Sequence, residues 1–505
     1  MTVNQKIGRL IQRTRQQRGL TQAELAKLLK TSQSAINRIE HGKQNLSLET
    51  LARLSDALEK PLLNLPGDAV SLRVTGGKKL SGSVDVKTSK NAAVGLLCAS
   101  LLNKGTTKLR NVSKIEEVHR IIEVLESIGV KVRWIGSDLE IKRPVKLKLD
   151  QMDEKAAKRT RSVIMFLGPL MHEAKNFKIP FAGGCKLGKR TVTPHMYGLE
   201  ELGLSVNTTN THYEVTSKPH AAPRSIVMYE SGDTTTENLL MAAALTPSTT
   251  VIKMASANYM VQDICLFLKR LGVKVEGIGT TVLTVTGVKE IKKNISYCPS
   301  EDPVEAMTFI AATITTDSCV EINRIPLDFL ELELTKLEKM GLDYEILHEY
   351  KADNGYTRLA DVRVNRHHGK LKAPAEKVYG RPFPGLNIDH LPYFVPIAAV
   401  AKGRTLIHDW VYENRAIYYT ELTKLGADVQ LADPHRVYVT GPTKWQPTDM
   451  ISPPALRPAV INLIAMLAAP GVSTLRNVYT INRGYEQLAE RLNSIGAEIE
   501  IVHEL

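Results

Sequence analysis

The sequence predicts an α/β protein in which a small all-α domain precedes a two-lobed body of six repeated α/β subdomains. Three observations support this fold class. Residues 1–65 contain only short helical patterns, the rest of the chain alternates strand and helix patterns, and a helix end with an apolar residue and a glycine recurs six times. A chain of 505 residues also exceeds one hydrophobic core, so two or three domains are expected.

Composition and charge narrow the class of protein. With 43% hydrophobic and 24% charged residues, the composition is that of a globular protein. No apolar stretch reaches the length of a membrane span and no secretory signal is present, so we expect a cytoplasmic protein without a membrane partner. The five cysteines show no paired spacing, so we expect no disulfide, no metal site and no cofactor. The net charge of +13 indicates anionic partners.

Residues 1–65 form the first predicted domain, and positive charge is concentrated there. Eleven Lys and Arg stand against five Asp and Glu. Thr21, Ser32 and Ser47 are N-cap residues that predict helices over 22–29, over 33–41 and from 48 onward, and Gly19 and Gly42 end the helices before them. Pro61, Pro66 and Gly67 then predict a linker, whose limits we set at 66–71.

Two runs in this domain carry a recognisable motif. The run Arg18-Gly-Leu-Thr-Gln-Ala-Glu-Leu-Ala and the run from Ser32 to Gly42 together resemble the helix-turn-helix of phage-repressor-type regulators. The resemblance implies a DNA partner, with the second helix of the pair in the major groove and usually a homodimer on two half-sites. The side chains that would face bases are Gln33, Ser34, Asn37 and Arg38. The alternative is a helical bundle used for dimerisation alone.

The body is predicted from a six-fold repeat. A helix ends in an apolar residue plus glycine and a short strand follows, at Gly129, Gly203, Gly272, Gly341, Gly426 and Gly496. Glycine suits the left-handed position after a helix, and the alternating run that follows suits a half-buried strand. The six units predict three subdomains per lobe, with a ligand cleft between the lobes. We place one lobe at 89–298 and the other at 72–88 plus 299–505.

Four motifs in the body resemble those of the enolpyruvyl transferase family. They are Lys87-Thr-Ser-Lys-Asn-Ala-Ala93, Gly183-Gly-Cys185 continuing through Gly188-Lys-Arg190 to His195, Glu413-Asn-Arg415, and Asn482-Arg-Gly-Tyr485. The Lys-Asn pair is similar to the branch that acts on UDP-N-acetylglucosamine in peptidoglycan synthesis, and the Ser-Lys-Ser motif of the shikimate branch is absent. The resemblance implies an inverse α/β prism, an EPSP synthase-like fold, and an enzyme that binds phosphoenolpyruvate and UDP-N-acetylglucosamine.

The resemblance also implies roles for single residues. Asp389 would take the proton from the acceptor hydroxyl, and Cys185 would be the acid or product-release residue, alkylated by fosfomycin in this family. Lys90 would act with them at the reacting centre. Nearby cations favour the thiolate of a cysteine, and Cys185 lies among Lys186, Lys189 and Arg190. Substrate binding is assigned to Asn91, Arg161, Arg190, His195, Asp302, Glu305, Arg415, Arg457 and Arg483.

The acceptor side departs from the family pattern. Glu230 stands where a Lys would help to bind the diphosphate, Asp233 adds a second carboxylate, and Thr193 stands where an Asp is usual. Residues 258–260 replace a run that normally contains Pro-Glu. Carboxylates beside a diphosphate are repulsive. Two further functions therefore stay open: transfer to another hydroxylated acceptor, and a transcription regulator that uses the body as a ligand sensor.

Overall fold

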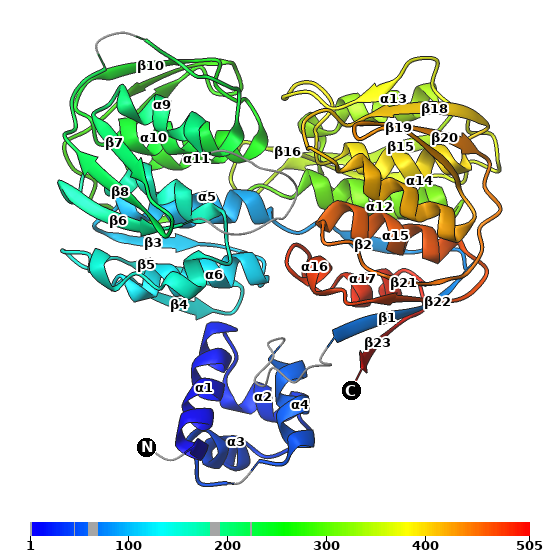
Figure 1. Cartoon of the computed structure of the whole chain (residues 1–505), viewed down its shortest axis with the longest axis horizontal. Helices are drawn as coiled ribbons and strands as arrows, with labels where there is room; N and C mark the ends of the chain where they lie inside the picture. Colours follow the sequence, from blue (N-terminus) through cyan, green and yellow to red (C-terminus); the bar gives the residue numbers. More distant parts are fainter. Residues whose placement is uncertain (1–2, 45, 59–68, 182–191, 223–224, 505) are drawn as a thin grey trace.

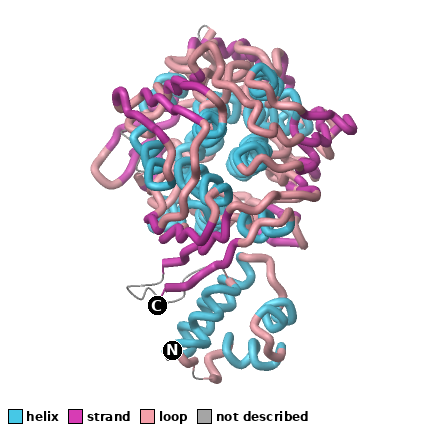
Figure 2. Tube along the Cα trace, turned by 90° about the vertical axis from the view of Figure 1, so that its right-hand side faces the viewer, coloured by secondary structure: helices cyan, strands magenta, loops and turns pink. Residues whose placement is uncertain are grey.

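The computed structural model describes residues 3–44, 46–58, 69–181, 192–222 and 225–504. It is a two-lobed α/β body with a separate helical domain beside it (Figure 1). A view turned by 90° shows the same separation, with the helical domain next to the chain's C-terminal end (Figure 2). In the described residues, no helix is long and apolar enough to span a membrane.

The described residues of the N-terminal domain form four helices. Each of the three predicted N-caps is confirmed: the side chains of Thr21, Ser32 and Ser47 accept backbone N–H groups in the first turns that follow. Gly19 and Gly42 have φ of +69° and +66°. The helices are α1 (Val3–Gln17), α2 (Gln22–Leu28), α3 (Gln33–Glu40) and α4 (Leu48–Ala57).

The core of this domain holds α1 against α3. Ile11, Ile36 and Leu54 are fully buried between the helices. Gly8 on α1 lies so close to α3 that a Cβ there would sit 2.4 Å from the carbonyl oxygen of Ile39. Across the same contact Arg15 Nε donates to Glu40 Oε1 over 2.5 Å, which ties α1 to the end of α3.

The first lobe contains three sheets. Their strand orders are β13-β3-β5-β4, β6-β8-β7 and β11-β12-β10-β9. The strands are β3 (Thr106–Leu109), β4 (Lys131–Ile135), β5 (Asp138–Lys142), β6 (Asn176–Pro180), β7 (Leu204–Thr208), β8 (His212–Ser217), β9 (Ile226–Val227), β10 (Thr249–Lys253), β11 (Lys274–Glu276), β12 (Val282–Thr286) and β13 (Ile295–Tyr297). The helices are α5 (Lys90–Ala99), α6 (Glu116–Ser127), α7 (Glu154–Ala157), α8 (Leu167–Leu170), α9 (Thr193–Glu200), α10 (Asp233–Ala244) and α11 (Tyr259–Leu271).

The second lobe contains three sheets as well. Their strand orders are β21-β22-β1-β23, β15-β16-β14-β2 and β17-β18-β20-β19. The strands are β1 (Ala69–Gly76), β2 (Ser83–Asp85), β14 (Val320–Pro326), β15 (Tyr344–Lys351), β16 (Arg358–Val364), β17 (Val378–Tyr379), β18 (Gly403–His408), β19 (Asp428–Asp433), β20 (Arg436–Gly441), β21 (Asp449–Ile451), β22 (Gly471–Arg476) and β23 (Ile499–Glu504). The helices are α12 (Pro303–Thr315), α13 (Glu331–Lys339), α14 (Phe394–Val400), α15 (Leu456–Ala468), α16 (Tyr479–Asn482) and α17 (Leu488–Ser494).

The six repeat glycines occupy equivalent positions, one per sheet. Each follows a helix and precedes a strand, and their φ angles lie between +91° and +98°. The left-handed backbone is therefore confirmed at all six positions, where a side chain would be strained. The fifth unit differs from the prediction in one respect, because the segment before Gly426 is a 3₁₀ helix, η6 (Ala416–Leu425).

Two short segments connect the lobes and are bonded to each other. Thr88 pairs with Glu301 as an isolated bridge, and Ser89 N–H donates to the Ser300 carbonyl over 2.8 Å. Each lobe has its own cluster of buried apolar residues, as does the helical domain. The cluster of the first lobe also includes Phe329, which belongs to the second lobe as predicted. In the second lobe, β1 pairs with β22 on one side and with β23 on the other, so the start of the body completes a sheet formed by its C-terminal part (Figure 1).

Candidate functional site

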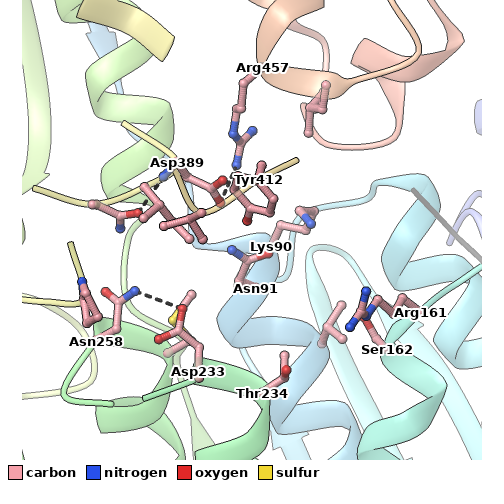
Figure 3. A pocket seen from close by; sticks show the side chains of 18 of the residues that line it. Lys90, Asn91, Arg161, Ser162, Asp233, Thr234, Asn258, Asp389, Tyr412 and Arg457 are labelled. Carbon is pink, nitrogen blue, oxygen red and sulfur yellow. Dashed lines mark hydrogen bonds and ion pairs between the residues drawn. The ribbon is translucent and has the colours of Figure 1, made fainter. Parts of the chain in front are cut away.

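A cavity of about 750 Å³ lies where the two lobes meet, and residues of both lobes line it. Among the described residues, six cations line it: Lys90, Arg161, Arg381, Arg415, Arg457 and Arg483. Asn91 and Asp389 also line it. All of these residues except Arg381 were predicted site residues, so seven predicted residues line one cavity (Figure 3). Such converging cations suit a small, highly anionic ligand.

Lys90, Arg415, Arg457 and Arg483 surround two carboxylates, and we call these four residues the cationic cluster. Lys90 is the first residue of α5, which Ser89 caps by accepting the N–H groups of Asn91 and Ala92. Lys90 therefore lies at the positive end of a helix dipole, which favours anions nearby. Burial lowers the pKa of Lys90 from its usual value, although Glu117 acts in the opposite direction.

Glu117 on α6 is the first carboxylate of the cationic cluster. It accepts Arg483 Nη2 over 3.2 Å and the Thr160 hydroxyl over 2.5 Å. Burial alone would raise the pKa of Glu117, but Lys90, Thr160 and Arg483 outweigh burial and lower it. Glu117 therefore stays ionised, and Arg483 links the second lobe to the first.

Asp389 is the second carboxylate, and two arginines hold it. Its oxygens lie 3.7 Å from Arg415 Nη1 and 3.5 Å from Arg457 Nη2 (Figure 3). The Asn387 side-chain oxygen accepts its backbone N–H over 2.9 Å, which fixes the turn that presents it. A quarter of the side chain is exposed, so a ligand in the cavity can reach this carboxylate.

Buried partners fix the two arginines in place. Arg415 Nε and Nη2 donate to Asp409 over 2.5 and 3.0 Å, and Tyr419 donates to the same carboxylate. Only Nη1 of Arg415 is thereby turned toward Asp389. Arg457 Nη1 donates to the Tyr485 hydroxyl over 3.2 Å. Because their positions are set before a ligand arrives, little side-chain ordering is needed on binding.

The opposite side of the cavity is acidic, and we call Glu230, Asp233 and Glu237 the acidic side. Asp233 begins α10 and accepts the Ser256 hydroxyl over 2.5 Å and Asn258 Nδ2 over 3.2 Å (Figure 3). Burial raises the pKa of Asp233, although Ser256 and Asn258 lower it in part. Asn258 thus holds the carboxylate that departs from the family pattern.

Glu237 lies one turn after Asp233 on α10 and is 1% exposed. Burial and the nearby carboxylates of Asp233 and Asp263 raise its pKa well above the usual value. The carboxyl of Glu237 is therefore protonated more readily than that of an exposed glutamate. Its Oε1 atom fills the space beside Gly95, where a Cβ would lie only 2.5 Å away.

Three predicted substrate-binding residues lie outside the cavity lining. His195 Nδ1 accepts from Asn238 Nδ2 over 3.1 Å, and its Nε2 lies 3.4 Å from the Thr234 hydroxyl, which does line the cavity. Burial and Arg161 lower the pKa of His195 to about 3, so the ring is neutral. His195 therefore supports Thr234 from behind.

The other two, Asp302 and Glu305, belong to the connection between the lobes. Asp302 caps α12 by accepting Val304 N–H over 2.8 Å, and burial raises its pKa. Glu305 accepts Lys87 N–H over 2.8 Å and pairs with Arg491 over 2.8 Å. The remaining predicted residues, Cys185 and Arg190, lie outside the described residues.

Sequence reasoning missed three residues that matter to the geometry. Glu117 and Arg381 line the cavity, and Asp409 holds Arg415. Glu117 lies in no motif, and its acidic neighbours on an amphipathic helix resemble an ordinary solvated face. Asp409 comes six residues before Arg415, which was a usable signal, because a buried arginine needs a carboxylate nearby.

Comparison with known proteins agrees with this geometry. The family model for EPSP synthase (3-phosphoshikimate 1-carboxyvinyltransferase) matches residues 74–492, and a helix-turn-helix model matches residues 11–65. UDP-N-acetylglucosamine 1-carboxyvinyltransferase of Treponema denticola is 30% identical over 429 residues, which cover 85% of this chain and 98% of that protein. The enzyme of the same name from Treponema pallidum is 31% identical over 427 residues, 85% of this chain and 98% of that protein.

Solved structures share the fold. The enolpyruvyl transferase NikO from Streptomyces tendae superposes with a TM-score of 0.73 at 22% identity, covering 87% of this chain and all of that one. EPSP synthase from Acinetobacter baumannii superposes with a TM-score of 0.66 at 18% identity, covering 86% of this chain and all of that one.

Proposed function

The chain belongs to the EPSP synthase family of enolpyruvyl transferases and carries an N-terminal helix-turn-helix domain, and from this premise we propose its reaction. The body transfers the enolpyruvyl group of phosphoenolpyruvate to the 3-hydroxyl of UDP-N-acetylglucosamine and releases phosphate. This is a step in the synthesis of peptidoglycan precursors. The observation that carries the proposal is the cationic cluster around Asp389, assembled from both lobes.

The roles follow from the charges of the two substrates. Phosphoenolpyruvate carries a carboxylate and a phosphate, for which Lys90, Arg457 and Arg483 are the matching donors. Asp389, oriented by its arginines, takes the proton of the acceptor hydroxyl as the oxygen attacks the enol carbon. An acid, for which we propose Cys185, gives a proton to the methylene carbon. Loss of a proton from the resulting methyl group and cleavage of the C–O bond to phosphate then complete the transfer.

The test is release of inorganic phosphate from phosphoenolpyruvate and UDP-N-acetylglucosamine by the full chain. We expect phosphate release that depends on both substrates. Cys185→Ser should lose turnover or product release, and fosfomycin should inactivate the parent protein but leave this variant unmodified. Phosphate release without dependence on the sugar nucleotide would contradict the proposal.

A second acceptor is favoured by one observation, the acidic side. Glu230 and Asp233 both line the cavity, and neither carboxylate suits a diphosphate. A hydroxylated acceptor without a diphosphate is therefore the alternative substrate class. Assays that compare UDP-N-acetylglucosamine with other nucleotide sugars and with a free sugar separate the two, because the preferred acceptor has the highest kcat/KM.

We also propose that residues 1–65 bind DNA through α3. Gln33, Ser34, Asn37 and Arg38 are exposed on one face of this helix, while Ala35, Ile36 and Ile39 on the other face are buried. A helix with this division can present amide and guanidinium groups to base edges in the major groove. The test is selection of DNA from a random library by the full chain. An Asn37→Ala, Arg38→Ala variant should lose the selected sequence.

A further inference from the structure

The helical domain is docked on the first lobe at a defined surface. Gly19, at the end of α1, packs on the Trp134 side chain, where a Cβ would lie 2.8 Å from Trp134 Cβ. Lys114 Nζ covers the same ring at 5.3 Å from its centroid. The Gln17 side chain bonds to Glu126 of α6, and the charge of Arg13 acts on the same carboxylate. We call this contact of α1 with α6 and β4 the docking surface.

A buried ion pair lies at the centre of the docking surface. Arg18 Nη2 is 3.4 Å from Glu116 Oε2, and the two side chains are 8% and 9% exposed. Glu116 also accepts Arg120 Nη2 over 2.9 Å, which anchors it on α6. Ion pairs at this depth depend strongly on geometry, because a displaced partner leaves a charge without compensation.

The next residue on α6 faces the cavity. Glu116 binds Arg18 of the helical domain, and Glu117 binds Arg483 and lies beside Lys90 in the cationic cluster. No side chain caps α6, since its N-cap is Ile115. The first turn is therefore held by the contacts of these two adjacent carboxylates, one on each side, together with the buried side chains of Ile115 and Val118.

A second ion pair continues from the docking surface to the DNA-reading helix. Arg15 lies one turn before Arg18 and holds Glu40 by two hydrogen bonds of 2.5 and 3.0 Å. Glu40 is the last residue of α3. Contacts thus run from the cavity through α6, Glu116 and Arg18 to α1, and from α1 through Arg15 to α3.

We propose that the chain is also a ligand-responsive DNA-binding protein, in which a small carboxylated phosphate ester at the cationic cluster lowers the affinity of the helix-turn-helix domain for DNA. The proposal rests on the donor and DNA roles proposed above. An anion that binds Lys90 and Arg483 competes with Glu117 for both cations and repels its carboxylate. The first turn of α6 moves, and the Glu116–Arg18 pair loosens.

The loss of affinity follows from orientation. A docked domain presents α3 in one orientation relative to the body, and a released domain samples many. On two half-sites, the two helical domains of a homodimer must adopt one relative orientation, so this added freedom is lost when DNA binds and DNA binding weakens. Linkage then requires DNA to weaken binding of phosphoenolpyruvate by the same factor.

The first experiment follows backbone hydrogen exchange in the full chain with and without phosphoenolpyruvate, with calorimetry to establish that the ligand is bound. We expect faster exchange in α1 and around Gly19 in the bound state. The Glu116→Gln variant should show fast exchange there already without ligand, and no further change with it. Unchanged exchange in α1 of the parent chain, with phosphoenolpyruvate bound, would overturn the proposal.

The second experiment measures DNA affinity by fluorescence anisotropy, on a sequence selected by the full chain. Saturating phosphoenolpyruvate should weaken binding about fivefold or more, the lower end of typical coupling between sites. Glu116→Gln should bind DNA with the weaker affinity in both conditions. The matched control is Glu290→Gln, because this carboxylate forms an exposed pair with Lys104 on the same lobe. The control should keep the full effect.

The outcomes separate this proposal from the functions on which it rests. A chain that binds phosphoenolpyruvate and DNA with no mutual effect keeps both functions and refutes the coupling. A chain that selects no DNA refutes the DNA role and with it the proposal, even where exchange in α1 responds. An equal response in Glu116→Gln and the parent chain shows that another route carries the effect and refutes the route through α6.

Discussion

The cationic cluster and the acidic side face each other across one cavity, yet they are built in different ways. In the cationic cluster, buried groups such as Asp409 and Tyr485 fix the arginines that hold Asp389. On the acidic side, Asp233 is held by the neutral groups Ser256 and Asn258. Among the residues that the structure describes, no cation forms an ion pair with Asp233. A charge held by opposite charges keeps its ionisation, whereas one held by neutral groups titrates more easily. Under the proposed reaction, the cationic cluster therefore keeps its charge for binding phosphoenolpyruvate, and the acidic side is the part that would select the acceptor.

The largest effect should come from removing the proposed base. Asp389→Asn keeps the shape of the side chain but cannot accept the proton, so kcat should fall by about 10²–10⁴-fold. Steady-state phosphate release measures this loss. The control is Asp433→Asn, an exposed carboxylate paired with Arg436, which should leave kcat unchanged. A variant with more than a tenth of the parent kcat would exclude Asp389 as the base.

The second prediction concerns Asp409, which holds Arg415 of the cationic cluster in place but takes no part in the proposed reaction. Asp409→Asn removes the carboxylate to which Nε and Nη2 of the buried Arg415 donate, which should cost about 3–5 kcal/mol of stability. Thermal unfolding should show this loss together with weaker binding of phosphoenolpyruvate. The exposed Asp449–Arg476 pair provides the comparison, since Asp449→Asn should cost less than about 1 kcal/mol. Equal losses in the two variants would contradict the assigned role of Asp409.

The third prediction concerns the acidic side. If a diphosphate binds there, Asp233→Asn removes a like charge, for which repulsion near 4 Å is about 4 kcal/mol at an effective dielectric constant of 20. Even a third of that repulsion gives a roughly tenfold lower KM for UDP-N-acetylglucosamine. Initial-rate kinetics at saturating phosphoenolpyruvate provide the value. A raised KM would mean that Asp233 holds the acceptor, which favours an acceptor without a diphosphate.

The smallest effect is a dependence on pH. Because burial raises the pKa of Asp233, its protonated fraction at mildly acidic pH is larger than that of an exposed aspartate. The KM for UDP-N-acetylglucosamine should therefore fall as the pH is lowered. The KM of the parent divided by the KM of Asp233→Asn should approach one at low pH and grow as the pH rises; a ratio that stays constant would contradict this.

Local patterns predicted much of the fold, and family motifs predicted much of the site. Gly129 and its five counterparts could be recognised because the end of a helix and the strand that follows it depend on only a few consecutive residues. Lys90 and Arg415 were found through motifs. The contact of Arg18 with Glu116 spans 98 positions and follows no local pattern. Likewise, nothing in the sequence shows that Asp233, Ser256 and Asn258 meet, because two separate helix starts have to be packed together first.

The position of β1 has a consequence for synthesis of the chain on the ribosome. Leu72 of β1 pairs with Leu475 of β22, about 400 residues later. At a translation rate of about 5–20 residues per second, β1 waits roughly 20–80 s for its neighbours. The helical domain and the first lobe are complete well before then. A nascent chain therefore carries a finished DNA-binding domain while its catalytic cavity does not yet exist, and truncated products would retain the former without the latter.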